Sequence, residues 1–81
     1  MKRNVLLTGA TGGIGEAICT KLSKNYNLVL VSRNQDKLKN FMRDNKSIMK
    51  RITCDLKEPD QITKMVEEVI SVNLNIDILV N

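Results

Sequence analysis

All four glycines of the chain lie within residues 9–15, directly behind a short apolar run near the start. Residues 5–7 read Val-Leu-Leu, residues 8–15 read Thr-Gly-Ala-Thr-Gly-Gly-Ile-Gly, and residues 14–24 form an amphipathic stretch. Glycines at such a junction let the backbone leave a strand at a positive φ angle, approach a phosphate without a Cβ, and bring a helix close to the strand. The pattern predicts a strand, a glycine turn and a helix whose first N–H groups face a diphosphate.

The residues expected to form this phosphate-binding turn are Gly9, Thr11, Gly12, Gly13, Ile14 and Gly15. A P-loop is excluded, because it would end in Gly-Lys-Ser or Gly-Lys-Thr, whereas Gly15 is followed by Glu16. A plain turn is the alternative, since glycine strings also occur in turns that bind nothing. A second apolar run at residues 28–31 completes a strand–helix–strand unit of the expected length, and this context favours a nucleotide site.

The rest of the chain continues the alternation of strands and helices. Asn34 is expected to cap a helix that runs to about Asp44, and Pro59 is expected in the first turn of a helix that ends near Val72. The predicted strands are residues 5–7, 28–31, 47–54 and 76–80, and the predicted helices are residues 14–24, 34–44 and 59–72. Four strands and three helices in this order predict an α/β fold, the amino-terminal portion of a doubly wound parallel sheet with order 3-2-1-4.

In this strand order the carboxyl ends of strands one and four lie side by side, where the order reverses and ligands bind. We therefore expect the glycine turn and Asn81 to line the same crevice. The first two helices are expected on one face of the sheet and the third on the other. The fourth strand, residues 76–80, is left as an open edge, which predicts self-association through this strand.

Composition argues against several other classes of function. The net charge of +4 over 81 residues comes from lysines and arginines that are spread along the chain, and aromatic residues make up only 2%, so nucleic-acid binding is not expected. The chain has no histidine, and Cys19 and Cys54 lack the spacing of metal ligands, so no metal site is expected. The apolar run at residues 5–7 is too short for an export signal or a membrane span, which favours a cytoplasmic protein with free thiols.

Four motifs together resemble the amino-terminal part of a short-chain dehydrogenase/reductase. They are the glycine pattern of residues 8–15, Ser32-Arg33, Cys54-Asp55-Leu56, and the closing Asp-Ile-Leu-Val-Asn of residues 77–81. The resemblance covers essentially the whole chain and is nearest to the shorter-subunit 3-oxoacyl-(acyl-carrier-protein) reductases. The glycines alone also fit the spacing of longer-subunit, epimerase-like relatives, and the other three motifs favour the shorter-subunit branch.

The resemblance implies a Rossmann-type domain that binds NAD or NADP, with residues 1–81 forming its truncated amino-terminal half. A protein that prefers NAD usually carries an acid at the end of strand two, but here that position holds Ser32, followed by Arg33. A guanidinium pairs with the extra phosphate of NADP, so NADP is the preferred cofactor and NAD the less favoured one. Alternatively, Arg33 is a solvated loop charge. Lys37 either assists Arg33 or faces water.

The resemblance also assigns roles to three residues at other strand ends. Asp55 would accept a hydrogen bond from the adenine amine, and Leu56 would flank the adenine ring. Asn81 would stand beside the point where the backbone meets the adenosine ribose. For Asp55, capping of the local turn is the alternative.

The Tyr-x-x-x-Lys pair that such reductases use for catalysis is absent, so no catalytic residue is assigned. The only tyrosine is Tyr26, and the residue four positions later is Leu30 rather than lysine. Tyr26 is therefore interpreted as a packing residue. Two functions stay open: the NADP-binding portion of an enzyme that reduces a carbonyl to an alcohol by hydride transfer, or a truncated or vestigial nucleotide-binding protein without catalytic activity.

Overall fold

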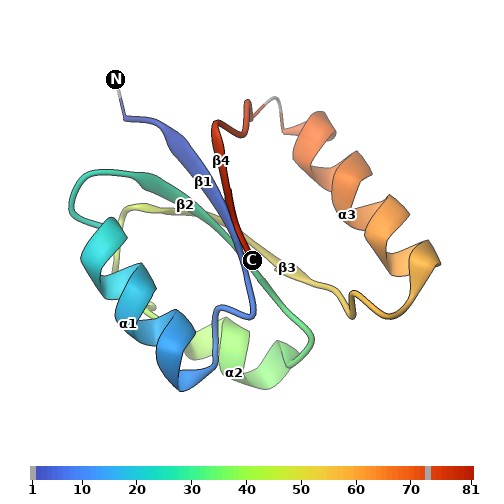
Figure 1. The fold of residues 1–81 in the computed structure, drawn as a ribbon, viewed down its shortest axis with the longest axis horizontal. Helices are drawn as coiled ribbons and strands as arrows, with labels where there is room; N and C mark the ends of the chain where they lie inside the picture. The colour runs from blue at the N-terminus through green and yellow to red at the C-terminus, as the bar shows by residue number, and fades with distance from the viewer. Residues whose placement is uncertain (1, 73) are drawn as a thin grey trace.

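A computed structural model describes residues 2–72 and 74–81 (Figure 1). The strands are β1 (Asn4–Thr8), β2 (Asn27–Ser32), β3 (Ile48–Thr53) and β4 (Ile78–Val80), and the helices are α1 (Gly13–Leu22), α2 (Gln35–Asn40) and α3 (Pro59–Ser71). Strands and helices alternate along the chain, as predicted. Local sequence explains two of the helix starts: Asn34 caps α2 with its side chain, and Pro59 begins α3, where a missing N–H breaks no helical hydrogen bond.

The four strands form one parallel sheet in the order β3-β2-β1-β4, which confirms the predicted order. β1 pairs with β2 along its whole length, from Asn4 opposite Asn27 to Thr8 opposite Val31. On its other side β2 pairs with β3, while β4 pairs with the remaining side of β1. Because all strands run parallel, their carboxyl ends lie together at one end of the sheet, and the segments that follow the strands meet there too.

Helices cover both faces of the sheet: α1 and α2 lie on one face, and α3 lies on the other (Figure 1). Side chains of β2 alternate between the two layers, with Leu28 and Leu30 packed in the first and Val29 and Val31 in the second. All four are at most 1% exposed, because a central strand of a parallel sheet is covered on both faces. The continuous apolar run of this strand is thus the centre of the core.

Helix α2 is shorter than predicted, since it ends at Asn40 rather than near Asp44. The Arg51 guanidinium reaches across from β3: Nε donates to the Leu38 carbonyl at 3.1 Å, and Nη2 donates to the Phe41 carbonyl at 2.7 Å. In a longer helix such carbonyls would accept from N–H groups of the next turn. Arg51 donates to the Leu38 carbonyl in the last turn of α2 and to the Phe41 and Met42 carbonyls just beyond it, so it stabilises the chain where the helix ends.

Strand β4 begins at Ile78 rather than at residue 76. Asp77 makes two hydrogen bonds with Asn4 at the start of β1. The Asp77 N–H donates to the Asn4 carbonyl and the Asp77 carboxylate accepts from the Asn4 N–H, each at 2.9 Å. The carboxylate takes the Asn4 N–H that a longer β1–β4 ladder would have used, so regular pairing starts at Ile78, two residues later than predicted. As predicted, β4 lies at the edge of the sheet, and Leu79 at its centre is 62% exposed.

Replacing Arg51 with methionine is expected to lower the free energy of unfolding by about 1–3 kcal/mol, because the carbonyls of Leu38, Phe41 and Met42 lose the hydrogen bonds that the guanidinium donates. Lys50→Met is the matched control, since Lys50 lies on the same strand and makes an ion pair with Glu68 at 3.8 Å. Urea denaturation followed by circular dichroism measures both variants. The control should stay within about 0.5 kcal/mol of the parent chain, and equal losses would show that Arg51 does not hold α2.

Candidate functional site

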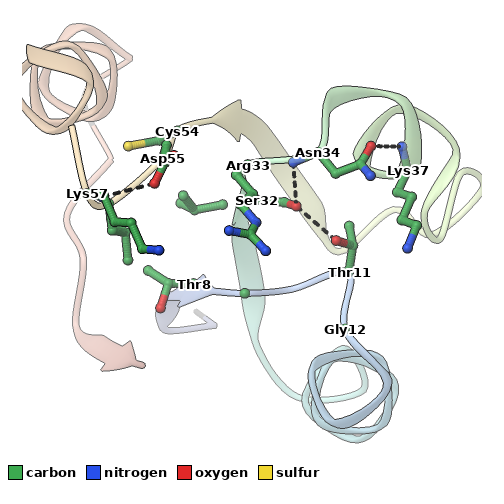
Figure 2. A pocket seen from close by; sticks show the side chains of 13 residues that line it. Thr8, Thr11, Gly12, Ser32, Arg33, Asn34, Lys37, Cys54, Asp55 and Lys57 are labelled. Carbon is green, nitrogen blue, oxygen red and sulfur yellow. Dashed lines mark hydrogen bonds between the residues drawn. The ribbon is translucent and has the colours of Figure 1, made fainter.

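A pocket of about 460 Å³ opens at the carboxyl ends of β1, β2 and β3 (Figure 2). Its walls are the glycine turn after β1, the turn between β2 and α2, and the loop between β3 and α3. Its volume lies in the range of small-molecule sites. The lining residues are Thr8, Gly9, Thr11, Gly12, Val31, Ser32, Arg33, Asn34, Lys37, Cys54, Asp55, Leu56 and Lys57.

Most of the residues named from the sequence meet at this pocket, although they come from three separate segments. Those on its lining are Gly9, Thr11, Gly12, Ser32, Arg33, Asp55 and Leu56. The other named residues lie beside it: Gly13, Ile14 and Gly15 form the start of α1, and Asn81 follows β4. The Asn81 Oδ1 atom accepts a 2.7 Å hydrogen bond from the Thr8 hydroxyl, so Asn81 reaches the pocket through a lining residue rather than directly.

Sequence reasoning did not assign Thr8, Val31, Asn34, Cys54 or Lys57 to the site, and it left Lys37 open. Each of these residues lies on the pocket lining. Thr8, Val31 and Cys54 lie at or near strand ends, and Asn34 and Lys57 are one or two positions from residues that were named. These residues could have been found by including every residue at or next to the carboxyl end of a predicted strand, because in a parallel sheet the segments at these ends face the same crevice.

Two positions of the glycine turn must be glycine for the fold itself. Gly9 has a φ of +66°, a backbone conformation that residues with side chains rarely adopt. A Cβ at Gly15 would lie 2.7 Å from the Ala10 carbonyl oxygen and closer still to the Gly9 carbonyl oxygen. Helix α1 therefore packs backbone against backbone on the turn, and a larger residue at position 15 would push it away.

Gly12 and Gly13 differ, because the chain leaves room for a side chain at both positions. The atom nearest to a Cβ at Gly12 is the Gly9 carbonyl oxygen, at 3.6 Å, and a Cβ at Gly13 would meet nothing within 4 Å. Glycine inside a helix is less favourable than alanine, and Gly13 is the first residue of α1. The fold thus gives no reason for glycine at position 13, whereas Gly12 is the N-cap of α1, where glycine is common. The open space at both positions lies at the start of the helix, where the first N–H groups have no acceptor within the helix.

A chain of hydrogen bonds joins the glycine turn to α2 (Figure 2). Thr11 Oγ1 lies 2.8 Å from Ser32 Oγ, and the Asn34 N–H donates to the same serine oxygen at 3.1 Å. Asn34 in turn caps α2, since its Oδ1 accepts from the Lys37 N–H at 3.0 Å. Ser32 is only 5% exposed, so its hydroxyl is committed to these partners and ties two walls of the pocket together.

Three cations and one carboxylate line the pocket, which gives it a positive field. Figure 2 shows the Arg33 side chain near the middle, with Lys57 on one side and Lys37 on the other. Asp55 is held by its own loop: its carboxylate accepts from the Lys57 N–H at 3.0 Å, and its N–H donates to Gln61 Oε1 at 2.7 Å. The turn-capping role considered for Asp55 is therefore present, and the pocket as a whole favours an anion.

Both cysteines are neutral thiols at physiological pH. Burial raises the pKa of Cys19 to about 11. Burial, with a smaller contribution from the Asp55 charge, also raises the pKa of Cys54, which lines the pocket. Since the thiolate is the reactive form of cysteine, neither side chain is prepared to act as a nucleophile.

Two other kinds of site are not found in the described part of the chain, residues 2–72 and 74–81. No group of acidic or cysteine side chains there is arranged to hold a metal ion. None of the helices in this part combines the length and the apolar character needed to cross a membrane.

A sequence profile described as short chain dehydrogenase matches residues 3–81. The chain belongs to the short-chain dehydrogenase family. This confirms the resemblance that rested on the four motifs. The matched region is the part of such dehydrogenases that includes the glycine turn and the three strand ends around the pocket.

Three curated relatives show how much of a short-chain dehydrogenase this chain represents. An uncharacterized oxidoreductase of Staphylococcus epidermidis is 38% identical over 77 residues, which cover 94% of this chain and 34% of the relative. A 3-oxoacyl-(acyl-carrier-protein) reductase of Buchnera aphidicola is 33% identical over 99% of this chain and 33% of its own length. An acetoacetyl-CoA reductase of Acinetobacter is 32% identical, over 94% of this chain and 33% of its own length. The chain thus spans about a third of the length of these relatives.

Solved structures share the fold of this chain. The structure of ElxO with NADP bound has a TM-score of 0.83 and 28% identity, and the match covers 100% of this chain and 34% of ElxO. A 4-hydroxyisoleucine dehydrogenase complexed with NADH has a TM-score of 0.81 and 25% identity, over 96% of this chain and 32% of that enzyme. Both nicotinamide cofactors therefore occur in structural neighbours of this chain.

The two kinds of glycine are expected to respond differently to alanine. Gly15→Ala should lower the free energy of unfolding by about 1–3 kcal/mol, because its Cβ would press on the carbonyls of Gly9 and Ala10. Gly13→Ala is the matched control and should leave stability unchanged or raise it by up to about 1 kcal/mol. Urea titration of both variants measures the difference. A Gly13→Ala chain as unstable as Gly15→Ala would contradict the open space assigned to Gly13.

Proposed function

We propose that the pocket binds the adenosine half of a nicotinamide dinucleotide, with the diphosphate over the start of α1. The observation that carries this proposal is the contrast among the glycines, since Gly12 and Gly13 leave space that the fold does not need. A diphosphate fills such a space well, because free N–H groups and the helix dipole both favour negative charge at a helix N-terminus. In this arrangement the N–H groups of Gly13, Ile14 and Gly15 donate to the diphosphate, and Thr11 lines the adjoining wall.

The adenine ring is assigned to the wall formed by the loop after β3. Leu56 is 44% exposed on this wall and offers an apolar surface to one face of the ring. The Lys57 N–H occupies one Asp55 oxygen, and the other oxygen is available to accept from the adenine amine. Asn81 is assigned to the ribose side of the site, where its hydrogen bond to Thr8 joins the ends of β4 and β1.

Charge at the end of β2 favours NADP over NAD in this proposal. The position that would hold an acid in an NAD-preferring site holds the uncharged Ser32, and the next residue is Arg33, which lines the pocket. A guanidinium forms paired, charge-assisted hydrogen bonds with a phosphate, and Lys37 at the start of α2 adds a second positive charge to the same wall. Because structural neighbours bind either NADH or NADP, we assign the preference for NADP to the side chains of Arg33 and Lys37.

Carbonyl reduction to an alcohol is the parent activity that we propose for this cofactor site, with NADPH as the hydride donor. Residues 1–81 are assigned as the amino-terminal, cofactor-binding half of a Rossmann domain, which agrees with their match to about a third of each relative. Tyr26 is not a candidate proton donor, because it packs against the core beside α1 and lacks the following lysine. The absence of a Tyr-x-x-x-Lys pair from these 81 residues favours, for the 81 residues taken by themselves, the second candidate function, a nucleotide-binding protein without catalytic activity.

The preference for NADP is tested by replacing Arg33 with alanine. Loss of a charge-assisted contact to the 2′-phosphate should weaken NADPH binding by roughly tenfold or more, while NADH binding changes by less than about twofold. Arg43→Ala is the matched control, since Arg43 is exposed and lies outside the pocket. Fluorescence of the bound dinucleotides gives both dissociation constants. Equal losses for NADPH and NADH would remove the phosphate-binding role from Arg33.

The open edge of β4 supports a further part of the proposal, that two copies of the chain associate through this strand. Within residues 2–72 and 74–81, β4 pairs with β1 alone, and an unpaired strand edge is a template for a second strand.

Leu79→Lys is expected to shift the chain toward monomer in sedimentation velocity, because a charge on an edge strand opposes pairing. Leu79 is already 62% exposed, so the change should not disturb the core. Ile70→Lys, on α3 and 70% exposed, is the control. If Ile70→Lys disperses the oligomer and Leu79→Lys does not, the association uses the helix face instead of the strand.

A further inference from the structure

The contact between the hydroxyls of Thr11 and Ser32 connects two segments that the sequence analysis treated separately. We propose that this pair is a positioning link, which holds the glycine turn and the start of α2 at a fixed separation. As a result, the diphosphate and the 2′-phosphate of a single ligand are bound as a unit. The inference rests on the proposed function and deepens it, because it says what makes the two phosphate sites cooperate.

The link completes the attachment of the glycine turn to β2. A backbone hydrogen bond from the Ala10 N–H to the Val31 carbonyl, at 3.2 Å, fixes the base of the turn. The hydroxyl of Thr11, at 2.8 Å from Ser32 Oγ, fixes its far side. Two attachments on successive residues of the turn restrain its rotation as well as its distance from the strand.

On the other side, Ser32 passes the restraint to α2. Its oxygen accepts from the Asn34 N–H, and the Asn34 side chain accepts from the Lys37 N–H in the first turn of α2. Arg33 lies between the two bonded residues, so the backbone that carries the guanidinium is held from both sides. The diphosphate wall and the 2′-phosphate wall are thus joined by three consecutive hydrogen bonds.

The energetic consequence depends on the ligand. A ligand that occupies both walls binds most tightly when their separation is already correct, because otherwise part of its binding energy is lost in ordering the protein. A ligand that occupies one wall does not need the other in place. Breaking the link should therefore weaken a spanning ligand selectively.

NADP⁺ serves as the spanning probe, and ADP and adenosine 2′-monophosphate serve as probes of the separate walls. Thr11→Val removes the hydroxyl at nearly constant shape and leaves the Ser32–Asn34 bond intact. We expect NADP⁺ affinity to fall roughly three- to tenfold, the value of one net hydrogen bond, while ADP and adenosine 2′-monophosphate change by less than about twofold. Thr11→Ser, which keeps the hydroxyl, should restore binding. Thr20→Val is the matched control, because the Thr20 hydroxyl bonds only within α1, to the Glu16 carbonyl at 2.9 Å.

Calorimetric titration of the full chain distinguishes the outcomes. Equal losses for NADP⁺ and ADP would overturn the link, because Thr11 would then contact the diphosphate directly. No loss for any probe would overturn it as well.

Failure of the proposed function itself has a different signature, which is that the parent chain binds none of the three probes. Amide hydrogen exchange then tests the link without a ligand. Faster exchange at Asn34 and Lys37 in Thr11→Val, relative to Thr20→Val, supports the restraint on α2. Unchanged exchange at both amides overturns it.

Discussion

Close contact between the backbone of α1 and the carbonyl groups of the glycine turn is the constraint on which the rest of this structure depends. Because Gly15 has no side chain, the helix lies directly against Gly9 and Ala10. This contact fixes where the helix begins and how its first N–H groups face the crevice. The positive φ of Gly9 acts together with this contact, since it turns the chain from β1 into the helix within a few residues.

Above this turn, the pocket is built from the polar ends of an apolar sheet. β2 is buried on both faces, and its final residue, Ser32, follows the apolar run with a polar side chain that lines the pocket and bonds to Thr11 and Asn34. The apolar core therefore ends where the polar lining of the pocket begins. The positive side chains around the pocket come from the turns that follow β2 and β3 and from the first turn of α2, so they can vary in chemistry without disturbing the packing beneath them.

The elements that were predicted well are those whose cause is local in the sequence. Period and composition were sufficient for the buried strand at residues 28–31 and for the helix that begins at Pro59. The first helix ends at Leu22, two residues before the predicted end, and the predictions were also wrong at the end of α2 and at the start of β4. Distant side chains contact the chain at the last two boundaries: Arg51 on β3 bonds at the end of α2, and Asp77 pairs with Asn4 at the other end of the chain. The sequence of one segment does not show which distant residue will contact it in the folded chain.

The sequence by itself determined the family, the α/β class, the strand order and the residues at the strand ends, because glycine spacing, apolar periodicity and right-handed crossovers are local or topological rules. Only the tertiary structure decided which of those residues share one pocket, that Asn81 reaches it through Thr8, and that Thr11 and Ser32 touch. It also separated the glycines that the fold needs from those that leave space. These properties depend on distances between segments that become neighbours only when the sheet assembles.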